Sequence, residues 1–304
     1  MSLDRDFAAE LGPDTLAIYL FHGVVEENAY AVRNYNNKHL DRATFRRIVG
    51  DLAAAGEALA LDDMLAIIEA GEPFPANAFA VTFDDGFANN LTVALPVLRD
   101  LGVPATIYLT SDFIDSNRMS WIDRIEWALE TTGGSVTLGW RDAPQPAATN
   151  DEKRAVLDDI RAHVKSTPDA DGDGLATDIQ AQLGLGETWS TDDPLDLKLT
   201  WDQVRELMAE SLITLGGHSH SHAVLSFLDE DGLAHELDTS LGLLAEHGGV
   251  GPTHYSYPEG LAHCYSPAVI DALKARGVRC CPTAIDGVNG AGTDPFELRR
   301  VSVM

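Results

Sequence analysis

The chain has 304 residues, with 21 Lys and Arg against 48 Asp and Glu, so its formal net charge is −27 at pH 7. Hydrophobic residues make up 45% of the sequence, which excludes a disordered chain, a collagen and a disulfide scaffold. The acid excess also argues against nucleic acid as a partner, because phosphate contacts require clustered Lys and Arg.

The sequence also indicates a compartment. No segment approaches the roughly 18 consecutive apolar residues of a membrane helix, so we expect no membrane span. Residues 1–14 carry acids where a secretion signal would be basic and then apolar, and we therefore expect a cytoplasmic protein. The three cysteines include the adjacent pair Cys280 and Cys281 and form no CxxC motif, which is typical of free thiols. Nothing in the pattern indicates an oligomeric state.

Short apolar runs alternate with amphipathic stretches along most of the chain. Predicted strands precede predicted helices in three units, at 15–21 and 43–56, 78–83 and 89–102, and 105–111 and 121–130. Predicted helices precede strands in three more, at 201–210 and 212–217, 233–248 and 253–260, and 266–277 and 278–285. This alternation favours an α/β fold with a mainly parallel sheet. Six such units fit a single barrel, covering 1–304, better than two small domains.

Residues 131–196 interrupt the alternation. This stretch is rich in Gly, Pro, Ala, Asp and Thr around one predicted helix at 152–164, and we interpret it as a mainly helical insertion. Its acidic segment Asp169, Asp171 and Asp173 matches the first half of a calcium-binding loop, but the position of the bidentate glutamate is Gln180. The missing carboxylate favours an acidic loop between helices over a calcium site.

Two acidic residues follow the predicted strand 78–83. Asp84 and Asp85 stand directly before Gly86, at a strand end where parallel α/β folds build their sites. Asp-Asp-Gly is also ordinary turn chemistry, so the motif alone leaves both interpretations open.

Three histidines follow the predicted strand 212–217. His218 and His222 are four residues apart, so one tight turn could bring both to one ion, whereas a strand would align His218, His220 and His222 on one face. Such density favours a metal site. An Asp from the earlier cluster would complete a His/His/carboxylate set, which is typical of zinc with a position open for water.

Two further strand ends carry polar groups. The segment from Tyr255 to Gly260 contains Pro258 and alone indicates only a turn. His22 follows the predicted strand 15–21, and it becomes a candidate only if it shares the barrel mouth with the other clusters.

In this order, the segments resemble the polysaccharide deacetylase family, carbohydrate esterase family 4, over most of the chain. Thr82–Gly86 is similar to the first family motif, His218–His222 to the second and Ser256–Gly260 to the third. The resemblance implies a distorted (β/α)7-type barrel and a bound Zn²⁺ or another divalent transition metal.

The resemblance also implies a role for each matching residue. Asp84 would be the general base, and the metal ligands would be Asp85, His218 and His222. In the third motif, the backbone N–H of Glu259 would face the oxyanion, with Tyr257 beside it in the groove wall. Trp121 and Asp123, which precede the insertion, are further candidates for substrate contact.

The sequence departs from the family pattern at two places. Ser256 stands where many members carry an arginine, so the base must be oriented from elsewhere, with Arg299 and Arg300 as candidates. The usual Leu-x-His motif with the catalytic acid is missing near the end. A circularly permuted branch of the family, including enzymes that act on poly-N-acetylglucosamine, carries the equivalent histidine in an N-terminal Tyr-His-x-Val segment. Leu20–Val24 is similar to that segment, which makes His22 the expected acid.

The expected function is a metal-dependent hydrolase that removes an N-acetyl or N-formyl group from an amino sugar or glycan. Two alternatives stay open: a catalytically inactive glycan-binding protein on the same fold, and a deacylase of a non-sugar amide. A metal-dependent phosphoesterase is disfavoured, since the sequence shows no anion-binding glycine loop and no arginine cluster. Asp84 beside a full ligand set favours an enzyme, because a binding protein needs no spare carboxylate there.

Overall fold

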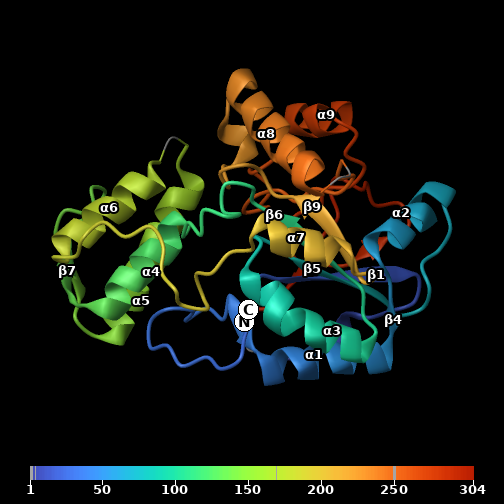
Figure 1. Cartoon of the computed structure of the whole chain (residues 1–304), viewed down its shortest axis with the longest axis horizontal. Helices are drawn as coiled ribbons and strands as arrows, with labels where there is room; N and C mark the ends of the chain where they lie inside the picture. Colours follow the sequence, from blue (N-terminus) through green and yellow to red (C-terminus); the bar gives the residue numbers. More distant parts are fainter. Residues whose placement is uncertain (1–2, 4, 169, 249–250) are drawn as a thin grey trace.

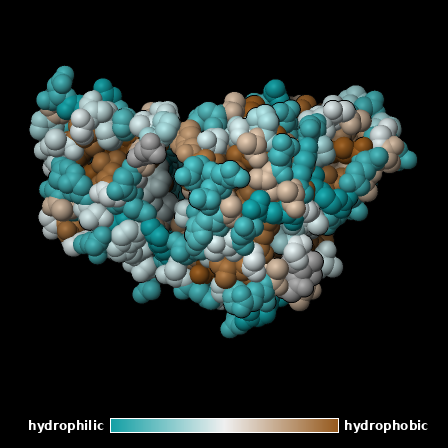
Figure 2. Space-filling model, turned by 90° about the horizontal axis from the view of Figure 1, so that it is seen from above, coloured by the Kyte–Doolittle hydropathy of each residue, from teal (hydrophilic) through white to brown (hydrophobic). Residues whose placement is uncertain are grey.

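The computed structural model describes residues 3, 5–168, 170–248 and 251–304. Figure 1 shows a body of sheet and helices, with a separate helical lobe at its left side. Hydrophilic residues cover much of the face seen in Figure 2, and apolar residues are confined to small patches. Among the described residues, no helix is long and apolar enough to cross a membrane.

A mainly parallel sheet forms the centre of the body. Its order is β10-β1-β5-β6-β9, with β11 also paired to β1 and β4 to β5, and only the β1–β10 pair is antiparallel. The strands are β1 (Thr15–Phe21), β4 (Glu57–Ala58), β5 (Ala78–Phe83), β6 (Ala105–Leu109), β9 (Ile213–Gly217), β10 (Asn289–Gly290) and β11 (Val301–Ser302). Strands β1, β5 and β6 are buried along nearly their whole length, as expected of parallel strands covered on both faces.

Irregular segments continue the sheet beyond β9 and lead it back to β1. The backbone N–H of Ser256 donates to the Gly217 carbonyl at 2.9 Å, and that of Tyr255 donates to the Cys280 carbonyl at 2.9 Å. Further along this path, Thr283 donates to the Leu298 carbonyl and Val303 to the Leu20 carbonyl of β1. This closure is consistent with a distorted barrel, and the prediction of an α/β fold with a mainly parallel sheet is confirmed.

Helices cover the outside of the sheet. In Figure 1, α1 and α3 lie together below the sheet, and α8 and α9 lie together above it. The helices of the body are α1 (Arg42–Ala55), α2 (Leu61–Ala70), α3 (Leu95–Leu101), α7 (Trp201–Met208), α8 (Glu230–Gly248) and α9 (Pro267–Ala275). Short helical turns complete it: η1 (Phe7–Glu10), η2 (Asn90–Ala94) and η3 (Leu225–Phe227). Side-chain caps fix several helix starts, such as the capping box between Thr200 and Gln203 on α7.

Two short ribbons lie apart from the main sheet. Strand β2 (Gly23–Val25) pairs in parallel with β3 (His39–Asp41), directly after β1. Strand β7 (Gly134–Val136) pairs antiparallel with β8 (Gln145–Ala147) in the lobe.

The lobe has a hydrophobic core of its own. It contains α4 (Trp121–Thr131), α5 (Asn150–Ser166) and α6 (Gly172–Gln182), which bury Ile125, Leu157 and Ile179 in one cluster. The predicted insertion 131–196 lies in this lobe, and the structure adds α4 to it. The predicted helix at 152–164 lies within α5, whereas α6 has no counterpart in the sequence prediction.

The acidic segment of the lobe caps helix α6 and forms ion pairs with arginines. Asp169 lies outside the described residues. The Asp171 side chain caps α6 by accepting from the Gly174 N–H at 2.8 Å, and Asp173 accepts from Arg124 at 3.1 Å and also from Arg118. Gln180 is buried and exchanges two hydrogen bonds with the Thr188 backbone. In the described part of the segment, Asp171 and Asp173 therefore stabilise the start of α6 and pair it with Arg118 and Arg124.

Buried neutral histidines make stability depend on pH. His39 is buried and its Nδ1 accepts from the Asn89 amide at 3.0 Å, and burial lowers the pKa of His39 well below its ordinary value. The unfolded chain takes up a proton near pH 6.5 that the folded His39 does not, so stability falls as pH drops below that value. Urea unfolding in metal-free buffer at pH 7 and 5 should show this loss. In the His39→Asn variant, the free energy of unfolding should fall less between pH 7 and pH 5 than in the wild type. In the exposed control His235→Asn it should fall as much as in the wild type. An equal fall in His39→Asn and the wild type would contradict this assignment.

Candidate metal and catalytic site

The candidate residues converge at one edge of the barrel. Asp84 and Asp85 follow β5, His218 follows β9, and His22 follows β1. Because these strands run parallel, their carboxyl ends meet at the same edge. The residues of these three distant segments therefore line one cavity, together with His222.

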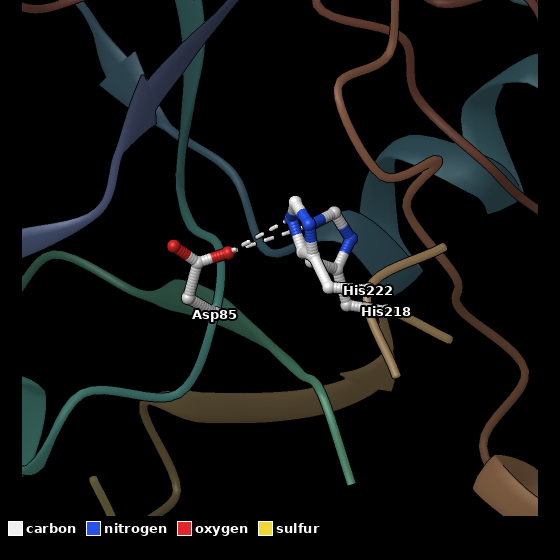
Figure 3. Close-up of side chains that lie close together, drawn as sticks. All are labelled: Asp85, His218 and His222. Atoms are coloured by element: carbon white, nitrogen blue, oxygen red, sulfur yellow. Dashed lines mark ion pairs between the residues drawn. The ribbon is translucent and has the colours of Figure 1, made fainter. Parts of the chain in front are cut away.

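Asp85, His218 and His222 point toward one another, as Figure 3 shows. Asp85 Oδ1 lies 3.6 Å from His218 Nε2 and 3.3 Å from His222 Nε2, and the three potential ligand atoms lie within 4.8 Å of one another. Donor atoms in a tetrahedral zinc site, each about 2.0–2.1 Å from the ion, are separated by about 3.3 Å. The two separations from Asp85 Oδ1 lie within about 0.3 Å of that value.

The surroundings of these three side chains also suit a metal. His218 Nδ1 donates to the Ser256 carbonyl at 2.9 Å, which leaves the Nε2 lone pair directed at the cluster. Asp85 Oδ1 is buried and has no hydrogen-bond partner among the described residues. Asp85 and His222 adopt positive φ angles of 80° and 64°, an unfavourable conformation that clusters at functional sites. We conclude that the residues fit a divalent transition ion.

Asp84 lies beside the three-residue cluster and is held by Arg300. Arg300 Nη1 and Nη2 donate to the two carboxylate oxygens, each at 2.8 Å, and Nη2 also donates to Ser256 Oγ at 2.9 Å. Burial raises the pKa of Asp84, but Arg300 and His218 outweigh it, so the net pKa lies below the ordinary value. Of the two base-orienting candidates, Arg300 is therefore the one in contact with Asp84. Its guanidinium is available there although Ser256 replaces the arginine that many family members carry in the third motif. Arg299 is exposed and donates to the Asp286 carbonyl instead.

His22 lines the same cavity but carries no charge near pH 7. Its carbonyl accepts from the Asn90 amide at 2.8 Å, and its buried Nδ1 lacks a hydrogen-bond partner within the described part of the chain. Burial lowers the pKa of His22 to about 4, more than the nearby Asp85 raises it. For the role of catalytic acid that the resemblance implies, His22 must therefore gain a proton before it can donate one.

Two lysines that the sequence analysis missed support the cluster. Lys38 Nζ lies 3.0 Å from Asp85 Oδ2 and 3.6 Å from Asp123 Oδ1. Lys198 is buried, with its Nζ 3.8 Å from Asp123 Oδ2, and burial lowers the pKa of Lys198 to about 8. Both lysines lie in loops without a recognisable motif. The one feature of the sequence that could have drawn attention to them is that this acidic chain contains only five lysines.

The cavity has a volume of about 280 Å³ and takes its wall from both the barrel and the lobe. Trp121 and Glu259 line it, as the sequence suggests, together with Lys38, Arg161 and Lys165. The structure does not bring the other two predicted contact residues to this wall: Asp123 is buried between the two lysines, and Tyr257 donates its hydroxyl to the Phe296 carbonyl in the core. His220 bonds Ser111 Oγ through Nδ1, outside the cavity.

Comparison with known proteins identifies the family. Residues 71–281 match the polysaccharide deacetylase family. The chain belongs to the polysaccharide deacetylase family. Its members hydrolyse amides of carbohydrates and generally depend on a divalent metal. Among curated proteins, no sequence matches the chain.

Solved deacetylase structures share the fold at low sequence identity. The Streptococcus pyogenes deacetylase PplD in complex with acetate superposes with a TM-score of 0.62 at 14% identity, covering 96% of this chain and 93% of that one. IcaB from Ammonifex degensii gives 0.61 at 16% identity, with 97% and 94% covered. The de-N-acetylase from Aggregatibacter actinomycetemcomitans gives 0.55 at 15% identity, with 94% of each chain covered. At these identities the likeness establishes the fold.

The Arg300–Asp84 pair makes a prediction about stability. Asp84 is 4% exposed and Arg300 is fully buried, so Arg300→Met leaves a buried carboxylate without its partner. We expect a loss of about 3–5 kcal/mol in the free energy of unfolding, measured with urea. The matched control Arg299→Met should change it by less than about 0.5 kcal/mol, because Arg299 is exposed. The double variant Asp84→Asn/Arg300→Met should recover part of the loss, and no recovery would contradict the pairing.

Proposed function

We propose that this deacetylase-family chain is a metal-dependent hydrolase that removes an N-acetyl or N-formyl group from an amino sugar. The observation that carries the proposal is the separation of two adjacent carboxylates. Asp85 faces His218 and His222, while Asp84 is held apart from them by Arg300, with its Oδ2 3.9 Å from His218 Nε2. One acid is thus available for proton transfer beside a set of metal ligands.

Asp84 is suited to accept the proton of the attacking water. A divalent ion held by Asp85, His218 and His222 would polarise the N-acyl carbonyl and lower the pKa of water. Since the pKa of Asp84 lies below its ordinary value, its carboxylate is ionised at neutral pH and ready to act as a base. The bidentate contact with Arg300 fixes its orientation toward the cavity.

The third motif supplies a candidate oxyanion donor. Glu259 has a φ of 60°, and the following Gly260 has a φ of 59°. Gly260 allows the close approach of this turn to the next segment, because a Cβ there would lie 2.5 Å from the Ala284 nitrogen. We propose that the Glu259 N–H stabilises the tetrahedral oxyanion, a contact typically worth about 3 kcal/mol.

His22 is the proposed donor to the departing amine. Its imidazole is neutral in the free site, so it takes up a proton from solvent water during the reaction and passes it to the amine nitrogen, while Asp84 keeps the proton of the attacking water. Negative charge that develops on the attacked carbonyl oxygen favours protonation of a nearby imidazole. An imidazole whose pKa is lowered is also a strong donor once it is charged.

The two alternatives from the sequence are weaker on this geometry. A glycan-binding protein gains little from the Arg300–Asp84 pair, because a buried ion pair contributes little net stability. The similar PplD structure holds acetate, the product that N-acetyl hydrolysis would release. Measuring acetate and formate release from chitooligosaccharides and nucleotide-linked amino sugars tests the function, and release from non-sugar amides alone would favour the second alternative.

The base and the ligands should respond differently to substitution. Asp84→Asn should abolish turnover and leave the metal content near stoichiometric, because Asp84 is not among the proposed ligands. His218→Ala should lose both. Elemental analysis of the purified variants together with acetate release checks this, and wild-type turnover by Asp84→Asn would show the role to be wrong.

Substitution of the proposed acid, His22, should lower kcat without changing the metal content. His22→Ala should lower kcat by about two to four orders of magnitude, the usual range for general acid catalysis, with metal content unchanged. Neither His220 nor His263 lines the cavity, so neither is placed to replace it. Steady-state kinetics on the best substrate provides the measurement, and a kcat within a factor of about two of wild type would assign the proton to another group.

A further inference from the structure

The helical lobe forms one side of the catalytic cavity. Trp121 and Ile122 at the start of α4, and Arg161 and Lys165 one turn apart on α5, line it opposite the barrel residues. Figure 2 shows the lobe at the left, set off from the body by a narrow hollow. The substrate must therefore enter between two walls that belong to different hydrophobic cores.

Trp121 is fixed in place by the lobe. Its indole packs against Gly172 at the start of α6 so closely that a Cβ there would lie 2.7 Å from Trp121 Cγ. Asp171 caps α6 at this point, and Ser120 caps α4 directly before Trp121. The acidic segment of the lobe, which resembles half a calcium loop in sequence, thus builds the support for an aromatic wall of the cavity.

Lys165 joins the lobe to the third-motif loop. Its Nζ lies 2.5 Å from Glu259 Oε2, and its carbonyl accepts from His263 Nε2 at 2.9 Å. The His263 ring stacks on Phe227 of η3, with centroids 5.8 Å apart. We call these two contacts of Lys165 the clasp. It crosses one side of the cavity, between α5 and the barrel.

A second connection also ties the lobe to the barrel. Arg118 donates to Asp173 on α6 and also, at 2.8 Å, to Asp112 in the loop that follows β6. Asp173 directly follows Gly172, against which Trp121 packs, so this connection lies on the side of the lobe that faces the cavity. The clasp therefore does not hold this side of the lobe alone.

We propose that the lobe restricts the site to the terminal N-acylated sugar of a short glycan and excludes internal residues of a long polymer, with Lys165 as a specificity-determining residue. This inference rests on the proposed function. An internal sugar is bonded to a neighbouring sugar on each side, so the glycan must leave the cavity in two directions. The clasp occupies one of these two sides. The cavity volume of about 280 Å³ lies just below the roughly 300–1,000 Å³ typical of small-molecule sites.

Binding to a turnover-deficient variant tests the proposal independently of catalysis. Calorimetry with Asp84→Asn and N-acetylated chitooligosaccharides of one, two, four and six sugars should give affinities that stop rising after the second sugar. In Asp84→Asn/Lys165→Met the affinity for the six-sugar chain, relative to the two-sugar chain, should rise about fivefold, as expected for loss of one weak contact. Lys165→Arg in the same background should preserve the restriction.

The controls separate this proposal from the proposed function. Lys274→Met removes an exposed lysine on α9, far from the cavity lining, and should leave the length preference unchanged. Affinity that climbs with every added sugar in Asp84→Asn, no binding of any chain, or an unchanged preference after Lys165→Met would each overturn the length restriction. Failure of the wild-type chain to release acetate from sugars that Asp84→Asn binds would instead overturn the proposed function alone.

Discussion

Two adjacent carboxylates are buried at the end of one strand, and the site is organised around keeping them apart. Asp84 and Asp85 are each 4% exposed, so each needs its own compensating charge. Arg300, which is near the end of the sequence, forms an ion pair with Asp84. Two imidazoles and Lys38 lie around Asp85. Asp85 also adopts a positive φ of 80°, an unfavourable conformation for a residue with a side chain. We propose that one carboxylate binds the metal and that the other stays free for proton transfer.

This separation depends on the irregular closure of the barrel. Segments 253–256, 280–285 and 298–303 form no long strands, but their backbone hydrogen bonds carry the sheet from β9 back to β1. These segments also carry Ser256 and Arg300, whose polar groups lie beside Asp84 and His218. Ser256 binds His218 through its carbonyl and Arg300 through its hydroxyl, so one residue of the third motif links the metal-ligand side to the base side. Arg300 precedes β11, which places its guanidinium inside the barrel, beneath Asp84.

The sequence predicts the fold class and the cavity position of Asp84, Asp85, His218 and His222, because apolar strands that end in polar motifs are strong local signals. The resemblance to the family motifs adds the two wall residues Trp121 and Glu259. The sequence leaves Arg299 and Arg300 undecided, since both precede β11 in a segment without regular secondary structure, where no periodicity tells which neighbour faces inward. It misses Lys38 and Lys198, whose loops have no periodicity, and it places Asp123 and Tyr257 at the substrate although both are buried elsewhere. The low pKa of His22 follows from burial by the folded barrel, which no local pattern reveals.

The central claim is that Asp85, His218 and His222 hold one ion while Asp84 does not. Anomalous diffraction at the zinc edge, from crystals of the chain grown with Zn²⁺, measures this directly. The account predicts a single strong peak about 2.0–2.2 Å from Asp85 Oδ1, His218 Nε2 and His222 Nε2, with both Asp84 oxygens still bonded to Arg300. A peak that takes Asp84 as a ligand, or one that lies away from these three side chains, would contradict it.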